Sequence, residues 1–315
     1  MMRVSVVVPL FNKAPYAARC IESILKQDFP DFELIVVNDG STDGSERIVA
    51  NFSDPRVRLV NQANAGPGAA RNRGMAEAEG EYIAFLDADD EWLPGYLQHS
   101  VRKLDDNPSA ACTTCGYGES PGAADLSRFW RKRNIPDTLY RVNPGTPAQL
   151  LVHMVAYMLP CTTLSRVNIL RNLGGFYEKE HCQYAEDAFL WVQVLLNHPV
   201  VFNFAPLVRI HRYAAELSKN LDGCRPVEPF LLRPDVLQAS CPSELQDLLD
   251  RFICIRAFKT ACVLGYWGDW RQARRIRGRF ACVGAWRLPY FLPALVCSTA
   301  AGSRLGAASR KLRGG

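Results

Sequence analysis

Residues 80–97 read GEYIAFLDADDEWLPGYL, and they are the most informative stretch of the chain. The apolar run at 82–86 is of the kind that forms a buried parallel strand. Three aspartates follow it directly, at Asp87, Asp89 and Asp90. Open α/β sheets bind their ligands at the carboxyl ends of the strands. We therefore expect this strand to carry a cluster of carboxylates to the ligand-binding edge of a sheet.

Strand and helix patterns alternate through the first hundred residues. Ser41 or Thr42 can cap a helix that runs to about Asn51. The other predicted elements are strands at 4–8, 32–37 and 57–60 and helices at 15–26 and 68–79. Alternation with short connections predicts an α/β fold with a Rossmann-like, mostly parallel central sheet and helices on both faces.

The pattern weakens after Leu104. Residues 110–114 can form a strand, whereas 116–147 are rich in Gly, Pro and charged residues and predict loops or an insertion. Further elements are expected as helices at 150–157, 186–196 and 243–266 and as a strand at 200–210. The eleven cysteines follow no regular framework, which favours reduced thiols in a cytoplasmic protein. Cys112 and Cys115 have no second pair at zinc spacing, so we interpret them as buried thiols.

The charge is unevenly distributed along the chain, whose formal net charge is +5. From Arg271 onward there are ten Lys or Arg and no Asp or Glu, so the first 270 residues have a net charge of −5. This predicts a polyanionic partner for the tail alone. Residues 288–303 are apolar but shorter than the roughly 20 residues that span a bilayer. We expect them to lie in a membrane interface; the alternative is a helical hairpin folded back on the rest of the chain.

The Asp87–Asp89 pair predicts a metal site. Closely spaced carboxylates repel one another unless a cation or solvent compensates them. Mg²⁺ and Mn²⁺ take hard oxygen ligands and keep positions open for phosphate. The alternative is a solvated acidic turn that caps a helix beginning near Leu93.

Three other segments end at or near the same predicted edge. Asp39 closes the second strand and can accept a hydrogen bond from a base or a ribose, and Phe11 can stack on a base or belong to the core. Residues 64–74, NAGPGAARNRG, lead into a helix whose N-terminus favours anions. Arg71 in that helix can reach a phosphate or an aspartate; the small residues can also serve close helix–sheet packing. No G-x-G-x-x-G follows a strand, which argues against a dinucleotide-dependent dehydrogenase.

In order and spacing, these segments resemble the family-2 glycosyltransferases of GT-A fold. The resemblance covers residues 3–105 and resumes at 173–178 (LGGFYE), 185–195 (AEDAFLWVQVL) and 208–212 (VRIHR). It implies transfer of a sugar, with inversion, from a nucleotide-diphosphate donor, expected to be a UDP-sugar, to an acceptor hydroxyl. Surface polysaccharide or lipid-linked glycan synthesis is the expected setting. The alternative is a non-catalytic sugar-nucleotide-binding protein of the same fold.

The resemblance also implies roles for residues of the donor side. Phe11 and Asp39 would bind the base of the nucleotide-sugar, and Pro9 would belong to the same nucleotide-sugar-binding site. Arg71 would help to place the nucleoside or the phosphates, and Asp87 would contact the ribose.

A second set of roles concerns the metal and the chemistry. Asp89 would be the direct ligand of Mn²⁺ or Mg²⁺, and His211 a further metal or phosphate contact. Asp187 would be the catalytic base, with Glu186 as its structural or acceptor-binding neighbour. Read without the family, the Glu186–Asp187 pair could only balance a helix dipole, and His211 could be structural.

Two departures from the family pattern stand out. Phe11 occupies a position where Tyr is usual, and Lys13 one where many members have Glu. The Q-x-x-R-W motif of processive members is also not met; the nearest run, 272–276, lacks the Trp.

The expected organisation is a GT-A catalytic domain over 1–215 and a helical, basic region over 216–315. The catalytic domain would have a nucleotide-sugar half at 1–105 and an acceptor half at 106–215. We expect a cytoplasmic protein at the inner face of the membrane, held there by its C-terminal region. Its partners would be a nucleotide-sugar donor and a glycan or lipid-linked acceptor. Nucleic acid is not expected, because the arginines of 271–279 are not interleaved with aromatic residues.

Overall fold

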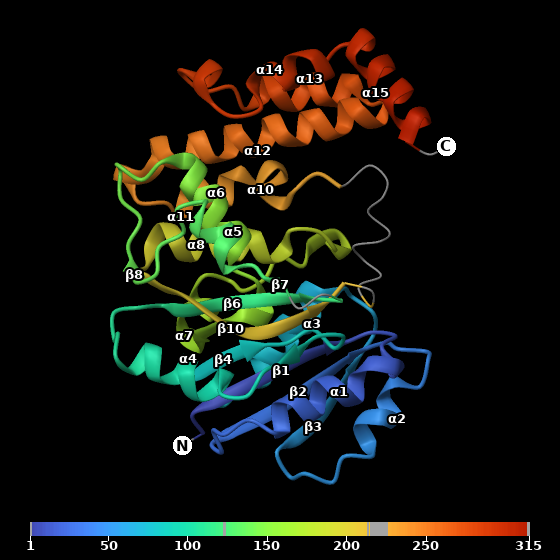
Figure 1. The fold of residues 1–315 in the computed structure, drawn as a ribbon, viewed down its shortest axis with the longest axis vertical. Coiled ribbons are helices and arrows are strands. Elements are labelled where there is room, and N and C mark those ends of the chain that lie inside the picture. The colour runs from blue at the N-terminus through green and yellow to red at the C-terminus, as the bar shows by residue number, and fades with distance from the viewer. Residues whose placement is uncertain (1, 122–123, 213, 215–225, 314–315) are drawn as a thin grey trace. The chain divides into compact units, whose positions relative to one another are not determined.

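The computed structural model describes residues 2–121, 124–212, 214 and 226–313. The chain divides into two compact units (Figure 1). The first contains residues 1–142 and 153–216, and the second contains residues 143–152 and 217–315. The predicted split into donor and acceptor halves stays a prediction.

The first unit is built on one mixed sheet whose strands run in the order β3-β2-β1-β4-β9-β6-β10-β5. Strands β1 to β4 are parallel to one another, as is the β6–β10 pair. Strand β9 pairs antiparallel with β4 and β6, and β5 pairs antiparallel with β10. The strands are β1 (Val4–Leu10), β2 (Phe32–Asp39), β3 (Val57–Gln62), β4 (Tyr82–Phe85), β5 (Glu91–Trp92), β6 (Cys112–Ser120), β7 (Ala124–Asp125), β8 (Leu139–Tyr140), β9 (Thr163–Arg166) and β10 (Val200–His211). The small strands β7 and β8 pair with β6 and β10.

Helices surround this sheet (Figure 1). They are α1 (Ala14–Leu25), α2 (Ser45–Ala50), α3 (Pro67–Glu77), α4 (Tyr96–Asp105), α5 (Ser127–Arg131), α7 (Val167–Asn172) and α8 (Glu186–Asn197). Helix α6 (Ala148–Tyr157) contributes residues to both units, because the division of the chain falls after Val152. Helix α3 packs on β1 and β2, and α4 packs on β6 and β10. A Cβ on Gly74 of α3 would lie 2.3 Å from Cγ1 of Val7, so only glycine permits this close helix–sheet contact.

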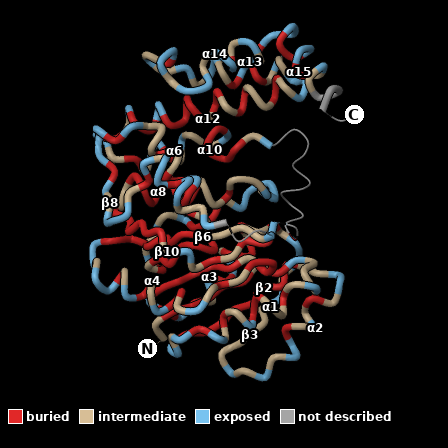
Figure 2. The backbone as a smooth tube through the Cα atoms, viewed as in Figure 1, coloured by how far each residue is buried: buried red, intermediate tan, exposed pale blue. Residues whose placement is uncertain are grey.

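The core lies along the central strands, which are buried over most of their length (Figure 2). Val6 of β1 is opposite Leu34 of β2 on one side and Ala84 of β4 on the other, and all three are inaccessible to solvent. Strands buried on both faces are expected to be continuous apolar runs rather than alternating ones. The carboxyl ends of β1, β2 and β4 therefore reach one edge of the sheet on a rigid base.

The fold class predicted from the sequence is confirmed: a mostly parallel α/β sheet of GT-A type with a helical C-terminal region. Two local predictions are wrong. Helix α2 is not capped by Ser41 or Thr42, because it begins after Gly44, whose φ of +85° starts the helix. Residues 116–120 are not loops but the second half of β6, which pairs along β10.

The second unit is helical. Helix α12 (Gln246–Trp267) is its longest element, and α13 (Trp270–Arg279), α14 (Phe291–Cys297) and α15 (Ala300–Arg313) pack on it. Two shorter helices, α10 (Pro229–Leu232) and α11 (Pro234–Ser240), precede it. A Cβ on Gly265 would lie 2.0 Å from the carbonyl oxygen of Cys297, so the absence of a side chain permits the α12–α14 approach. Among the described residues, no helix has both the length and the apolar character to cross a bilayer.

Candidate active site

The loops that follow β1 and β2 are tied to each other at the carboxyl edge of the sheet. The backbone N–H of Asn12 donates to Oγ of Ser41 (3.1 Å), and the side chain of Asn12 accepts from the N–H of Thr42 (2.8 Å). These bonds explain why Ser41 and Thr42 do not cap α2. Phe11 lies beside this junction with 45% of its surface exposed, a position from which its ring can stack on a ligand.

Asp39, at the end of β2, is buried and organises the loop that leads into α3. One carboxylate oxygen accepts from the N–H of Ala65 (2.9 Å) and from the side chain of Gln62 (2.8 Å). The other accepts from the N–H of Gly66 (2.9 Å). A carboxylate has about four lone-pair sites, so these three bonds leave little capacity for a nucleotide base. Its predicted role in base binding stays a prediction, and a structural role is already visible.

Arg71 of α3 is almost fully buried and joins two segments. Its Nη2 donates to Oδ1 of Asp87 (2.7 Å), after β4, and its Nη1 donates to Oε1 of Glu186 (2.8 Å), at the start of α8. The sequence allowed Arg71 to reach either a phosphate or an aspartate, and in the structure its side chain contacts an aspartate, Asp87. Two nearby carboxylates outweigh the effect of burial and raise the pKa of Arg71, which stays charged.

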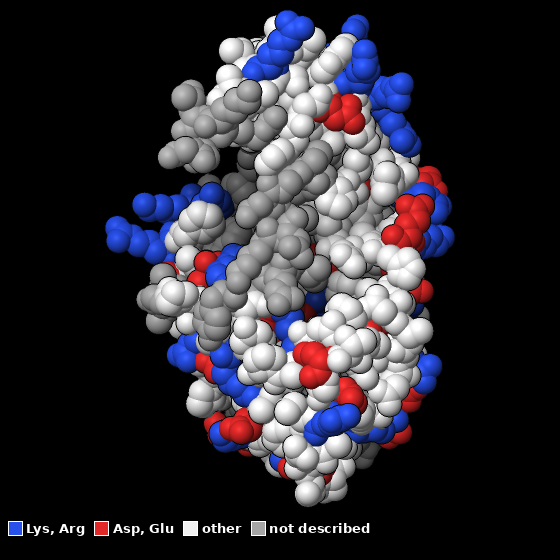
Figure 3. Space-filling model, turned by 90° about the vertical axis from the view of Figure 1, so that its right-hand side faces the viewer, with Lys and Arg blue, Asp and Glu red and all other residues white. Residues whose placement is uncertain are grey.

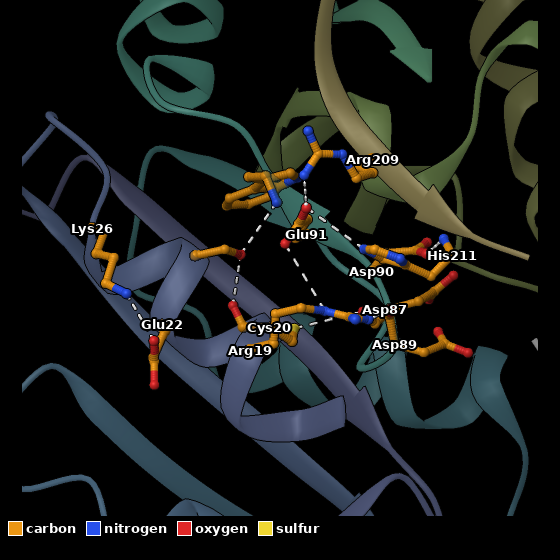
Figure 4. Close-up of polar contacts among 12 residues, drawn as sticks. Arg19, Cys20, Glu22, Lys26, Asp87, Asp89, Asp90, Glu91, Arg209 and His211 are labelled. Carbon is orange, nitrogen blue, oxygen red and sulfur yellow. Dashed lines mark hydrogen bonds and ion pairs between the residues drawn. The ribbon is translucent and has the colours of Figure 1, made fainter. Parts of the chain in front are cut away.

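The turn after β4 carries a dense set of charges (Figure 4). Asp89 accepts from the ammonium of Lys13 (2.8 Å), and Asp90 accepts from the backbone N–H of His211 (2.9 Å), at the end of β10. Arg19 extends from α1 and donates to the carbonyl oxygen of Asp89. Burial and the charge of Asp87 raise the pKa of Asp89, and the same two causes raise that of Asp90 further.

Glu91 connects this turn to β10. Its carboxylate accepts from Arg209, and its Oε1 lies 3.6 Å from Nε2 of His211. Burial and the charge of Arg19 lower the pKa of His211, so the imidazole is neutral near pH 7. A neutral imidazole is the form that binds metal ions.

Asp187 lies in the first turn of α8, directly after Glu186. Its carboxyl group is closely surrounded by protein, although the residue reaches the surface in part. This loss of water, followed by the charge of Glu186, raises the pKa of Asp187 to about 7. Its neighbour Glu186 bonds to Arg71, which in turn bonds to Asp87 after β4, and the charges of Arg71 and Asp87 also act on the pKa of Asp187. A carboxylate with a pKa near neutrality is suited to general base catalysis.

A comparison with known protein families identifies the chain. The model of the family described as glycosyl transferase family 2 matches residues 5–172, more than half of the sequence. The chain belongs to this family. Its match runs from β1 to the end of α7 and so includes the turns that carry Asp39 and Asp87–Glu91.

Three known proteins illustrate the likeness of this family-2 glycosyltransferase to others. EpsJ of Bacillus subtilis, described as an uncharacterized glycosyltransferase, is 40% identical over 195 residues, which are 59% of this chain and 54% of EpsJ. The crystal structure of S. aureus TarS 1-349 with UDP-GlcNAc has a TM-score of 0.63 at 19% identity, covering 98% of this chain and 92% of TarS 1-349. The mannosyltransferase PcManGT from Pyrobaculum calidifontis, with GDP-Man and Mn²⁺, has a TM-score of 0.58 at 18% identity, covering 98% and 87%. This chain therefore spans about half the length of EpsJ, and the two structures support the fold alone.

The acidic turn of this family-2 glycosyltransferase offers donors that fit a divalent cation. Asp87 is partly exposed, Asp89 contributes a hard oxygen, and His211 ends β10 beside them. In the described part of the chain, no group of three or more His, Cys, Asp or Glu side chains is arranged so that it could hold a metal ion. Phosphate oxygens and water would have to complete the coordination. On the protein side, Lys13 already pairs with Asp89 and Arg71 with Asp87.

Sequence reasoning missed several charged residues of the site. Arg19, Glu91 and Arg209 surround the aspartates, yet none of them was assigned a role. Arg209 lies inside the quoted VRIHR run, so a signal was present. Arg19 lies in an ordinary helical pattern, and nothing in the sequence marks it. Lys13 was noted as a departure, but its partner could not be inferred.

Proposed function

We propose that this chain transfers a sugar from a nucleotide-diphosphate donor, with UDP as the favoured nucleotide, to an acceptor hydroxyl with inversion at the anomeric carbon. The supporting observation is Asp187, whose pKa is raised to about 7 at the start of a helix joined to the acidic turn through Glu186, Arg71 and Asp87. Such a carboxylate can accept a proton near neutral pH and release it again.

In the proposed reaction, Asp187 takes the proton of the acceptor hydroxyl as its oxygen attacks the anomeric carbon. The new carbon–oxygen bond forms while the bond to the diphosphate breaks, and the nucleoside diphosphate leaves with that electron pair. One in-line displacement without a covalent intermediate inverts the anomeric centre. Asp89, with His211 and Asp87 nearby, would hold a Mn²⁺ or Mg²⁺ ion, which neutralises the leaving diphosphate when bound. Phe11 would stack on the base, and Asp39 and Pro9 would border it.

The reaction is tested by a panel of nucleotide-sugars and by one pair of matched variants. Release of nucleoside diphosphate is measured with Mn²⁺ present, with and without membrane extract as the source of acceptor. Asp187→Asn keeps the shape and removes the proton acceptor, so transfer should fall by about 10²-fold or more while nucleotide binding persists. Asp247→Asn is the control, because Asp247 is also in the first turn of a helix but is exposed. Transfer that is the same in both variants would assign the base to another residue.

The acceptor is proposed to be a glycan or a lipid-linked precursor at a membrane surface. The C-terminal unit supports this proposal, because Val283, Trp286, Leu292 and Val296 are all exposed, Val283 at 95%. From Arg271 onward the sequence has ten Lys or Arg and no Asp or Glu, and they lie on both sides of the apolar residues 288–303. Figure 3 shows Lys and Arg side chains along the top and one edge of this unit, with an acidic side chain next to them. Exposed apolar side chains among basic ones suit a surface of anionic lipid.

A further inference from the structure

Lys13 has a defined position beside Asp89. Its ammonium lies 2.8 Å from Oδ2 of Asp89 and 2.7 Å from the carbonyl oxygen of Ala214, three residues after His211. The two paired side chains are only 17% and 12% exposed. The backbone at Lys13 is fixed as well, because its N–H donates to Oγ of Ser45 (2.9 Å). This ion pair is therefore a built contact, unlike the exposed pair of Lys26 and Glu22 at the other end of α1.

The protein supplies other cations to the acidic turn too. Arg71 pairs with Asp87, and Arg209 pairs with Glu91. With Lys13 on Asp89, the negative charge of the turn is largely balanced before any metal binds. A divalent ion that approaches Asp89 meets an ammonium on the same carboxylate, which repels the ion and already occupies one of the two carboxylate oxygens.

We propose that Lys13 competes with the divalent metal for Asp89, so that this site binds free metal weakly until a diphosphate is present. The proposal rests on the proposed function, which assigns the metal and the diphosphate to this turn. A diphosphate adds negative charge that can accommodate the metal and the displaced ammonium together. The Glu that many members of the family have at this position would lack such a competing charge, so the departure at Lys13 has a physical consequence.

The test is a titration of the full chain with Mn²⁺, followed by the electron paramagnetic resonance signal of the free ion. Lys13→Met and Lys13→Gln remove the charge, Lys13→Arg keeps it, and Lys26→Met removes a charge from the exposed pair as the control. Without nucleotide, the two neutral variants should bind Mn²⁺ about tenfold more tightly than the wild type, because a competing charge is gone. The Mn²⁺ affinity of Lys13→Arg should stay within about twofold of the wild type because the competing charge is kept. The Mn²⁺ affinity of Lys26→Met should do so as well, because its pair with Glu22 is exposed and contributes little. With UDP added, the difference between wild type and Lys13→Met should shrink.

The double variant Lys13→Met with Asp89→Asn tests whether Asp89 is the metal ligand. If it is, the higher Mn²⁺ affinity of Lys13→Met should disappear in the double variant. Equal Mn²⁺ affinity in wild type and both neutral variants would overturn the proposal, as would a gain that survives Asp89→Asn. If the neutral variants are unfolded without metal, Mn²⁺ should refold them by replacing the ammonium, and failure to do so also overturns it. Nucleoside diphosphate release is measured on the same preparations. If the wild type releases nucleoside diphosphate but the neutral Lys13 variants bind Mn²⁺ no more tightly than it does, only this inference is refuted. If the wild type releases nucleoside diphosphate from no donor, the proposed function is refuted.

Discussion

Arg71 and Glu186 form a buried ion pair between α3 and α8, with 2.8 Å between Nη1 and Oε1. They are separated by 115 residues in the sequence. The contact is possible because Gly68, one turn before Arg71, has no side chain: a Cβ there would lie 2.6 Å from the carbonyl oxygen of Tyr177. Through the second bond of Arg71 to Asp87, the helix that starts with Glu186 and Asp187 is fixed relative to the end of β4.

Arg71→Met should destabilise the protein strongly. Removing one partner of a buried ion pair leaves uncompensated charge, which costs about 3–5 kcal/mol of unfolding free energy. Arg73→Met on the same helix is the control, because its pair with Glu77 is more exposed and should be worth less than about 1 kcal/mol. Urea unfolding of both variants measures the difference. Similar small losses in the two would mean that Arg71 does not hold α8.

Transfer should depend on pH through Asp187. Its pKa of about 7 means that the carboxylate is mostly protonated at lower pH and cannot accept the acceptor's proton. The rate at saturating donor should therefore fall about tenfold for each pH unit below that value, and level off above it. Rates measured across this range check the expectation. A flat profile would contradict Asp187 as the base.

The raised pKa of Asp187 also predicts that the free energy of unfolding decreases as the pH rises, because the folded and unfolded states bind different numbers of protons. The pKa of Asp187 is raised from 3.8 to about 7 in the folded state, so between these values the folded protein binds more protons than the unfolded one. Its stabilising contribution is complete below the unfolded pKa and is lost as the pH rises through about 7. Asp187→Asn should remove this decline from the pH dependence of urea unfolding, while Asp247→Asn should leave it intact. Parallel curves for wild type and Asp187→Asn would rule the trend out.

Asp89→Ala should abolish donor hydrolysis and transfer, and chelation of the wild type should do the same, reversibly on addition of Mn²⁺. The reason is that a leaving diphosphate needs its charge neutralised. Asp106→Asn, at the exposed end of α4, is the control and should retain activity. Full activity in excess chelator would end the metal-dependent interpretation.

The sequence predicted the positions of the acidic residues because those depend on local pattern. Apolar runs locate β1, β2 and β4, and the residues directly after such strands must reach the same edge of the sheet. Asp87 and Asp89 could be singled out in this way, whereas Asp187, at the start of α8, was singled out only through the resemblance of residues 185–195 to the family.

The partners of those residues could not be predicted, because they depend on contacts between distant segments. Lys13 and Asp89 are 76 residues apart, and no local rule pairs them. The cap of α2 was missed for a related reason: Ser41 and Thr42 bond to Asn12 instead of to their own helix. Tertiary hydrogen bonds here overrode a local preference that is worth only about 1 kcal/mol.

Ala185→Gly should stabilise the protein. Ala185 precedes α8 with a φ of +58°, a left-handed conformation that costs an L-residue roughly 1–2 kcal/mol. Glycine would relieve this strain. It would also raise the conformational entropy of the unfolded chain, which destabilises the folded state by about 0.4–1 kcal/mol. We expect a net gain of roughly 0.5–1 kcal/mol in urea unfolding. Ala188→Gly, inside the same helix, should instead lose about 1 kcal/mol. A loss at both positions would show that Ala185 carries no strain.

The membrane prediction is best tested by point variants, because truncation after Asp269 would remove α14 and uncover the face of α12 on which it packs. Phe291, expected from the sequence to enter the lipid, instead places its ring 5.6 Å from that of Phe258 of α12. Trp286 and Leu292 remain exposed, and Arg287 lies over the indole of Trp286.

Trp286→Ser combined with Leu292→Ser should therefore reduce sedimentation with vesicles that contain phosphatidylglycerol. Leu139→Ser, an exposed leucine of β8 in the first unit, should not. Salt should weaken vesicle binding of the wild type only in part, because it screens the arginines and leaves apolar insertion intact. It should weaken binding of the double variant more strongly, since that protein has lost two of its large exposed apolar side chains and depends more on charge. Donor hydrolysis without membranes should be the same in all three proteins, because every assigned site residue lies at or before His211. If the double variant binds vesicles as well as the wild type does at high salt, Trp286 and Leu292 are not the anchor.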